Sequence, residues 1–287
     1  MSLRINSNVS AMNAYRNLSV SDNAMSSSLE KLSSGLRINR AADDAAGLSI
    51  SDGLESQIGG LTVAVRNAQD GINVVQTADG ALNETTSILQ RMRDLAVQAS
   101  NTGSQDADAQ GAANTEVTQL KAELDRIANT TAFGGKQLLD GSYDGTFQVG
   151  ANNTTNDQIE VDLSTGNTAL FGATSTVTGF TSTGLGVNTV DLTADPQGAI
   201  DAIDTAIKGV STARATMGAY QNRFQHTVNN LNVAVENLTA SDSQIRDVDM
   251  ASEMTNFTKN QILVQAGTAM LAQANQTPQN VLSLLKG

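Results

Sequence analysis

The sequence predicts a mainly α-helical protein in which long coiled-coil or bundle rods from both termini pack together around a small β-rich central lobe. Three observations support this fold class. Apolar residues recur with heptad spacing at both ends of the 287-residue chain, only 2 prolines interrupt it, and aromatic residues make up only 3%. A core with so few rings must rest on small aliphatic contacts, which are typical of seams between helices.

The first rod is predicted over about residues 42–100. Its apolar seam runs through Leu54–Val75 in steps of three and four, and it continues to Ala96 with polar interruptions that include Asp79 and Arg93. At a rise of 1.5 Å per residue this helix would be roughly 90 Å long. Residues 101–104 end it, because Asn-Thr-Gly-Ser is a typical helix terminator. A second helix follows, with four apolar residues on one face: Val117, Leu120, Leu124 and Ile127.

Glycines inside the first rod allow two interpretations. Each costs about 1 kcal/mol relative to alanine in a helix, so they could weaken or break it. They could also permit close approach of a neighbouring rod or subunit. The unbroken heptads over Leu54–Val75 favour the second interpretation. The glycines concerned are Gly47, Gly53, Gly59, Gly60, Gly71 and Gly80.

The middle of the chain is predicted to be β-like. Phe133-Gly134-Gly135 and Asp140-Gly141 are turn signals, and residues 146–149 and 159–163 alternate as half-buried strands do. Residues 165–193 are dense in Thr, Gly and Asn with sparse apolar side chains, which predicts an exposed lobe that tolerates change.

A third helix is predicted from Pro196, with Asp195 as its cap. Its seam runs from Ile203 to Leu238 with only Arg214 and Gln221 polar, and the simplest partner for it is the seam of the first rod.

Both ends of the chain carry apolar stripes with few charges. Such stripes need burial, either against each other or against copies of the same chain. The stripe residues, taken as the assembly core, are Leu18, Met25, Leu29, Leu32 and Leu36 near the N-terminus and Met254, Phe257, Val264, Met270 and Leu271 near the C-terminus.

Composition excludes several classes of function. The chain has no cysteine and a single histidine, which argues against thiol catalysis, Cys-ligated metals and a Ser-His-Asp triad. Its net charge of −12 argues against binding a nucleic-acid backbone. Asp43-Asp44 and the group Asp242, Asp247 and Asp249 are interpreted as helix-start charges rather than a catalytic pair or a calcium loop. We therefore expect no enzyme activity, no metal and no cofactor.

The N-terminal residues lack the apolar stretch and cleavage motif of a secretory signal, and no window approaches 18 consecutive apolar residues. No membrane insertion is therefore expected. Two locations stay open at this point, the cytoplasm or export by a route that leaves no cleaved signal.

Several long, ordered motifs resemble bacterial flagellins. The resemblance covers nearly all of residues 1–150 and 195–287. The motifs are Arg4–Val9, Leu32–Asn39, Ala41–Leu48, Gln90–Gln98, Phe147–Ala151, Ile245–Ala251 and Gln273–Gln276.

The resemblance implies a structural subunit that polymerises with itself into the helical flagellar filament used for swimming. Residues 1–41 and 242–287 would be the coiled-coil core lining the inner tube. Residues 42–140 and 195–241 would form the rod domain, and residues 141–194 a small variable outer region. The family is secreted unfolded through the flagellum's own channel to an extracellular place in the filament, and its partners include an export chaperone, a cap protein and junction proteins.

The resemblance also implies contacts with a host Toll-like receptor through Arg91, Leu95 and Glu116. The alternative is that Arg91 and Glu116 serve packing between subunits. Three other functions remain as alternatives: a hook–filament junction protein of the same superfamily, an enzyme carried on the same scaffold, and a plain coiled-coil adaptor. The segment 140–194 has no His or Cys and is too short for an inserted enzyme domain.

Overall fold

The structure, a computed structural model, describes residues 8–103, 106–164 and 178–286, with only the backbone described for residues 277–286. Most of the opening motif at residues 4–9 therefore lies outside the described residues. The chain divides into two compact units. Unit 1 comprises residues 1–56 and 237–287, and unit 2 comprises residues 57–236. Unit 1 thus joins segments from distant parts of the chain, whereas unit 2 is one continuous segment.

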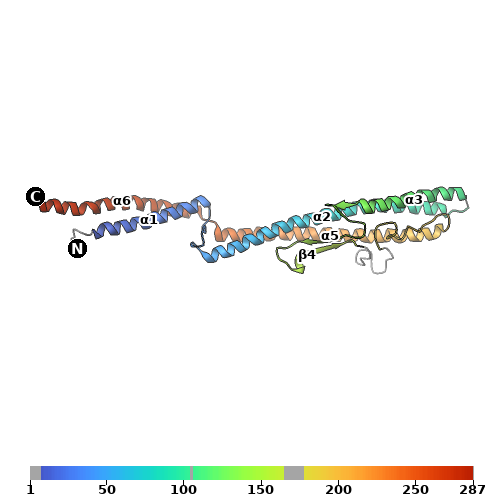
Figure 1. The fold of residues 1–287 in the computed structure, drawn as a ribbon, viewed down its shortest axis with the longest axis horizontal. Coiled ribbons are helices and arrows are strands. Elements are labelled where there is room, and N and C mark those ends of the chain that lie inside the picture. The colour runs from blue at the N-terminus through green and yellow to red at the C-terminus, as the bar shows by residue number, and fades with distance from the viewer. Residues whose placement is uncertain (1–7, 104–105, 165–177, 287) are drawn as a thin grey trace. The chain divides into compact units, whose positions relative to one another are not determined.

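Unit 1 is built on a pair of helices, α1 (Val9–Ser34) and α6 (Met250–Lys286), which lie side by side in Figure 1. The Asn8 side chain caps the start of α1 by accepting a hydrogen bond from the Ala11 amide at 3.0 Å. Gly35 ends α1 in the left-handed conformation, at φ 75°, which glycine adopts without strain. The two helices run antiparallel, because Asn8 donates to the Ala274 carbonyl at 2.8 Å while Val248 donates to that of Gly35.

Unit 2 contains most of α2 (Ala45–Ala99), all of α3 (Ala107–Thr130) and most of α5 (Pro196–Arg246). The first rod and the helix after it are therefore confirmed. The predicted start of the third helix is also confirmed, since Asp195 accepts a hydrogen bond from the Gly198 amide at 2.9 Å.

The seams of α2 and α5 pair, as predicted, and the structure shows that they run antiparallel. The polar residues that interrupt them account for this register. Asp79 of α2 accepts a hydrogen bond from Arg214 of α5 at 2.9 Å, and Arg93 of α2 donates to Asp204 of α5 at 2.6 Å. Opposite charges at facing positions disfavour a shifted alignment, in which each charge would lose its partner.

The Arg93–Asp204 ion pair is expected to lose its contribution to the stability of unit 2 in acid. The Arg93 guanidinium holds the pKa of the Asp204 carboxyl below its ordinary value of 3.8. A carboxyl with a lowered folded-state pKa contributes its stability above the unfolded-state pKa and loses it as the pH falls through the folded-state pKa. We expect Asp204→Asn to unfold at a lower temperature than wild type at pH 7. We expect this difference in unfolding temperature to vanish in strong acid. Thermal unfolding from pH 7 to pH 2 measures the difference, and a difference that widens in acid would contradict this account.

Two short antiparallel hairpins lie in unit 2. Strands β1 (Ala132–Phe133) and β2 (Lys136–Gln137) flank the predicted Gly134-Gly135 turn. Strands β3 (Asp144–Gln148) and β4 (Gln158–Asp162) pair with Phe147 opposite Ile159. A 3-10 turn, η1 (Thr155–Asp157), precedes β4. The predicted alternation is confirmed where Ile159 and Val161 of β4 are buried.

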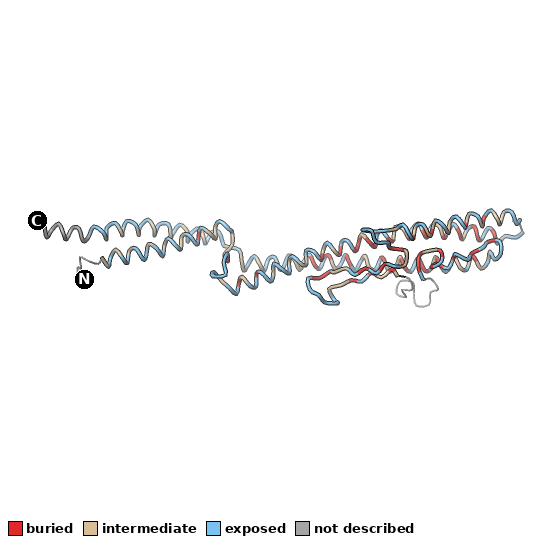
Figure 2. Tube along the Cα trace, in the orientation of Figure 1, coloured by how far each residue is buried: buried red, intermediate tan, exposed pale blue. Residues whose placement is uncertain are grey.

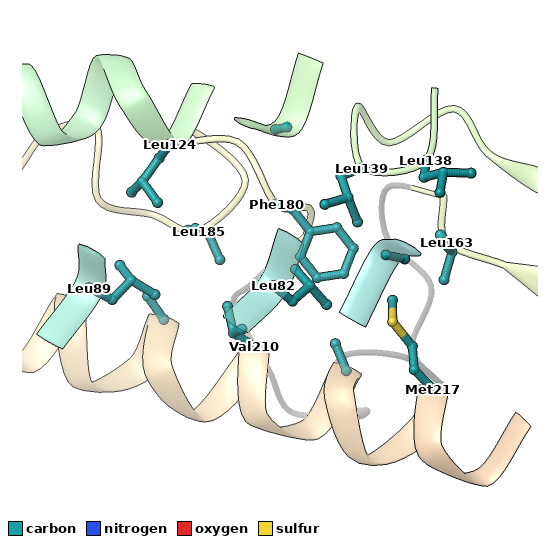
Figure 3. Close-up of a cluster of buried hydrophobic side chains, with 14 of the residues drawn as sticks. Leu82, Leu89, Leu124, Leu138, Leu139, Leu163, Phe180, Leu185, Val210 and Met217 are labelled. Atoms are coloured by element: carbon teal, nitrogen blue, oxygen red, sulfur yellow. The ribbon is translucent and has the colours of Figure 1, made fainter. Parts of the chain in front are cut away.

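The segment after β4 differs from the expected exposed lobe over its described part, residues 178–193. Its few apolar side chains are buried in the same core as α2, α3 and α5: Phe180, Leu185, Val187, Val190 and Leu192. Figure 3 shows Phe180 and Leu185 lying among leucines of α2 and α3. Polar groups of α3 fix this segment, because Asp125 accepts hydrogen bonds from both the amide and the hydroxyl of Ser182, at 2.7 and 2.9 Å.

The described residues form mainly helices with two small antiparallel sheets, which confirms the predicted fold class. Across the described ranges, no helix combines the length and the apolar character that a membrane crossing requires. Within the same ranges, no group of three or more His, Cys, Asp or Glu residues is arranged to hold a metal ion.

Candidate assembly surface

Unit 1 has almost no hydrophobic core. Among its described side chains only Ser28, Ile38 and Ser51 are buried, together with Gly47, and Ile38 is the only large apolar residue of the four. Figure 2 shows the contrast, with buried positions concentrated in unit 2 and intermediate or exposed ones along α1 and α6. Two helices that bury so little cannot offset the entropy of ordering them, so unit 1 requires a further surface to pack against.

Most of the large apolar side chains that are exposed in the described part of the chain belong to unit 1. Tyr15 is 65% exposed and Met270 is 64% exposed, whereas unit 2 contributes only Val63, Val97 and Val233 to this group. The exposed apolar residues of unit 1 are Val9, Met12, Tyr15, Val20, Leu29, Ile50, Met250, Met254, Ile262, Leu263 and Met270. An apolar surface that continues along two helices marks an interaction site.

The predicted assembly residues divide into two groups. Seven lie half-buried along the contact between α1 and α6 or at its end: Leu18, Met25, Leu32, Leu36, Phe257, Val264 and Leu271. Three are exposed on the outside of the pair: Leu29, Met254 and Met270. The first group holds α1 against α6, and the second group faces outward, where it is free to contact another molecule.

The contact between α1 and α6 alternates large and small side chains. Gly267 lies opposite Leu18, and a Cβ at position 267 would come within 3.2 Å of the Leu18 Cδ1 atom. Ser28 is 5% exposed on the same face of α1 as the half-buried Met25 and Leu32. These small residues bring the helices close together but bury little apolar area, which leaves the large side chains on the outside.

Sequence reasoning overlooked part of the exposed surface. Val9, Met12 and Val20 lie off the heptad positions of α1, and Leu263 lies off those of α6. A single seven-residue repeat describes one stripe and misses a second. The signal that could have found them is the apolar character of both helices on more than one face, which is typical of a helix with several partners.

The three residues considered for receptor contacts lie near the α2–α3 contact. The Arg91 Nε atom donates to the Glu116 Oε1 atom at 2.7 Å, and both side chains are partly exposed. Leu95 is only 4% exposed and packs in the core of unit 2. The structure therefore leaves Arg91 and Glu116 accessible and places Leu95 beneath the surface.

Of the acidic residues that were interpreted as helix-start charges, Asp43, Asp44 and Asp249 lie just before helices, whereas Asp242 lies inside α5 near its C-terminal end and Asp247 directly follows that helix. Asp44 accepts a hydrogen bond from the Gly47 amide at 2.9 Å, and Asp249 accepts one from the Ala251 amide at 3.0 Å. The Asp43 carboxylate binds the amides of residues 39 and 40, and these bonds hold its pKa below the ordinary value. The carboxylates of Asp43, Asp44 and Asp249 thus accept hydrogen bonds from backbone amides, as capping residues do, while Asp242 and Asp247 accept hydrogen bonds from serine hydroxyls.

Comparison with known proteins shows which protein family this chain resembles. The model of the bacterial flagellin N-terminal helical region matches residues 5–144, and that of the bacterial flagellin C-terminal helical region matches residues 200–285. A flagellin of Bacillus subtilis is 48% identical over 99% of this chain and 100% of its own length. A flagellin of Halalkalibacterium halodurans is 52% identical over 98% of this chain and 99% of its own length.

The fold is also shared with a solved structure of a protein assigned as flagellar hook-associated, from Vibrio parahaemolyticus. The two align with a TM-score of 0.57 and 12% identity, over 71% of this chain and 100% of that one. This likeness concerns the fold alone, whereas the two family models and the full-length relatives concern the sequence. On these matches, the chain belongs to the bacterial flagellin family.

Proposed function

We propose that this chain is a structural subunit that polymerises with copies of itself into the flagellar filament. One observation carries the proposal, the set of large apolar side chains that α1 and α6 of unit 1 leave exposed. Burial of each large side chain such as Met254 or Ile262 contributes about 1.5–3 kcal/mol, so coverage by neighbouring copies supplies the stability that the helix pair lacks. The closely similar full-length flagellins support this role.

Within the filament, we assign residues 1–41 and 242–287 to the inner tube. Residues 42–140 and 195–241 form the surrounding rod domain, and residues 141–194 lie outermost. The contrast in burial supports this assignment, because the terminal helices have outward-facing apolar residues while α2, α3 and α5 enclose their own core. The described part of the middle segment, residues 141–164 and 178–194, contributes the β3–β4 hairpin and buried side chains such as Phe180 to that core.

The resemblance to flagellins also supports proposals about export and partners. The chain would be secreted through the flagellar channel and reside outside the cell, with a chaperone binding its C-terminal segment. Cap and junction proteins would contact it at the ends of the filament. The exposed apolar side chains of α6, among them Met250 and Ile262, give a chaperone a hydrophobic surface to cover before assembly.

A host Toll-like receptor is a further proposed partner. The Arg91–Glu116 pair would be its contact, since both side chains reach the surface of unit 2. Leu95, which is buried, would contribute indirectly by holding α2 in place beneath this pair. The role of the protein in the filament does not depend on this contact, and we propose no catalytic role for any residue.

Seeded polymerisation tests the proposed function. Purified chain should add to fragments of its own filaments and form long helical polymers visible by electron microscopy. Because the chain carries a net charge of −12, added salt screens repulsion between copies and should lower the concentration needed for assembly. Filaments that dissolve faster as salt is added would contradict this account, and a chain that never elongates would rule out the proposed function. A hook–filament junction protein would instead be a minor component of sheared filaments.

A further inference from the structure

Two flagellin-like motifs from distant parts of the sequence, Leu32–Asn39 and Ile245–Ala251, meet in unit 1. Leu36 and Asp247 form an isolated antiparallel bridge. It is flanked by two backbone hydrogen bonds, from the Arg37 amide to the Arg246 carbonyl at 2.6 Å and from the Val248 amide to the Gly35 carbonyl at 3.0 Å. We call residues 35–38 and 245–248 the joint. It fixes the end of α1 directly beside the start of α6.

Side chains reinforce the joint. The Arg37 guanidinium donates a hydrogen bond to the carbonyl of Ile245, in the last turn of α5, where carbonyls lack helical partners and the helix dipole favours a cation. Ile38 is 1% exposed, and among the side chains of unit 1 that the structure describes it is the only large apolar one that is buried. It is seated against Gly47, where an added Cβ would lie 2.7 Å from the Ile38 Cδ1 atom.

Two further bonds tie the adjoining ends of α2 and α5 together. Ser51 donates to the Asp242 carboxylate at 2.6 Å, and Arg246 donates to Glu55 at 3.2 Å. The joint thus combines several long-range hydrogen bonds with Ile38, the one large apolar side chain buried among the described residues of unit 1. Away from the joint, α1 and α6 depend mainly on half-buried side chains such as Leu18 and Val264.

We propose that the joint is the nucleus from which α1 and α6 pair, so that it closes first and sets their register as a subunit enters the polymer. This inference rests on the proposed filament function. Helix pairing has a costly first step and cheaper later ones. A bridge that already aligns Gly35 with Val248 supplies that first step, and each further turn toward the chain ends then adds one seam contact.

Elongation kinetics test the order of events. Arg37→Ala removes the cap on α5, which is worth about 1 kcal/mol and hence about fivefold in a rate if the cap forms before the rate-limiting step. We expect seeded elongation of the full chain to slow about fivefold while filament dissociation changes by less than about twofold. Arg40→Ala is the matched control, because the Arg40 side chain is 70% exposed and forms its ion pair with Glu30, which lies outside the joint.

Two outcomes of these kinetics would overturn the proposal. In the first, Arg37→Ala leaves elongation unchanged and accelerates dissociation, which would mean that the joint closes late. In the second, Arg40→Ala slows elongation as much as Arg37→Ala does, which would mean that any lost cation has this effect. If wild type itself fails to elongate, the proposed filament function fails, and the following comparison decides on the joint alone.

A disulfide across the joint tests nucleation without polymerisation. Positions 36 and 247 face each other between the two flanking hydrogen bonds, a placement that brings Cα atoms within disulfide range, and the chain has no other cysteine. We expect the oxidised form of the Leu36→Cys/Asp247→Cys chain to have more helix by circular dichroism than its reduced form, with hydrogen-exchange protection spreading into α1 and α6. Equal helix content and equal protection in the two forms would overturn the proposal.

Discussion

Replacing Phe224 by alanine is expected to lower the free energy of unfolding of unit 2 by about 3–5 kcal/mol. Phe224 is fully buried on α5, and its ring fills the space that Gly71 leaves on α2. A Cβ at position 71 would come within 2.6 Å of the Phe224 Cζ atom. The ring also meets Phe147 of β3 edge-on, with centroids 5.4 Å apart. One side chain therefore joins α2, α5 and the β3–β4 hairpin.

Denaturant unfolding of the full chain measures this loss, provided that the signal follows unit 2. Val233→Ala is the control, because Val233 is on the same helix and 57% exposed, so its truncation should change stability by less than about 0.5 kcal/mol. A Phe224→Ala variant as stable as the control would show that the α2–α5 contact does not depend on the ring.

A charge in the exposed stripe of α6 is expected to abolish polymerisation and leave unit 2 intact. Met254 is 50% exposed, so Met254→Glu costs little in the free chain. If neighbouring copies cover this side chain, the variant must bury an unpaired carboxylate, at a cost of several kcal/mol. At 1.4 kcal/mol per tenfold change, 3 kcal/mol already raises the concentration needed for assembly by about a hundredfold.

Met254→Leu is the matched control for this prediction. It keeps an apolar side chain of similar volume, so assembly should be preserved. Sedimentation of seeded samples measures the polymerised fraction, and thermal unfolding confirms that unit 2 stays folded in both variants. Normal polymerisation of Met254→Glu would show that this face of α6 stays in solvent within the filament.

The helical rods and their pairing were predictable from the sequence because period and charge are local signals. Asp79 and Arg214 interrupt two apolar seams at positions that face each other, and the structure joins them in an ion pair. The helix starts were also readable, since Asp195 before Pro196 is a cap with a known geometry.

The burial of residues 178–193, the described segment after β4, was not predictable in the same way. Phe180 and Leu185 lack any regular spacing, and their burial depends on a gap among α2, α3 and α5 that only the folded chain defines. The burial of Leu95 was missed for a related reason. Near its C-terminal end α2 contacts both α3 and α5, as the Arg91–Glu116 and Arg93–Asp204 pairs show, so a single seam understates the buried area.

The sequence predicted that unit 1 carries apolar residues for assembly, but it identified only some of those that are exposed. Leu29, Met254 and Met270 were expected in the assembly core and lie on the outside of the helix pair. Sequence alone left open whether the stripes cover each other or face other copies. The structure shows that α1 and α6 contact each other along one face and still leave large apolar side chains exposed, which is the basis of the filament proposal.

A helical reconstruction of the polymer formed by this chain tests that proposal most directly. The account predicts that neighbouring copies cover the outward-facing side chains of α1 and α6, including Tyr15, Leu29, Met254 and Ile262. It further predicts that the joint between residues 35–38 and 245–248 is retained in every subunit. A polymer in which α1 and α6 are absent from the contacts, with these side chains still facing solvent, would contradict it.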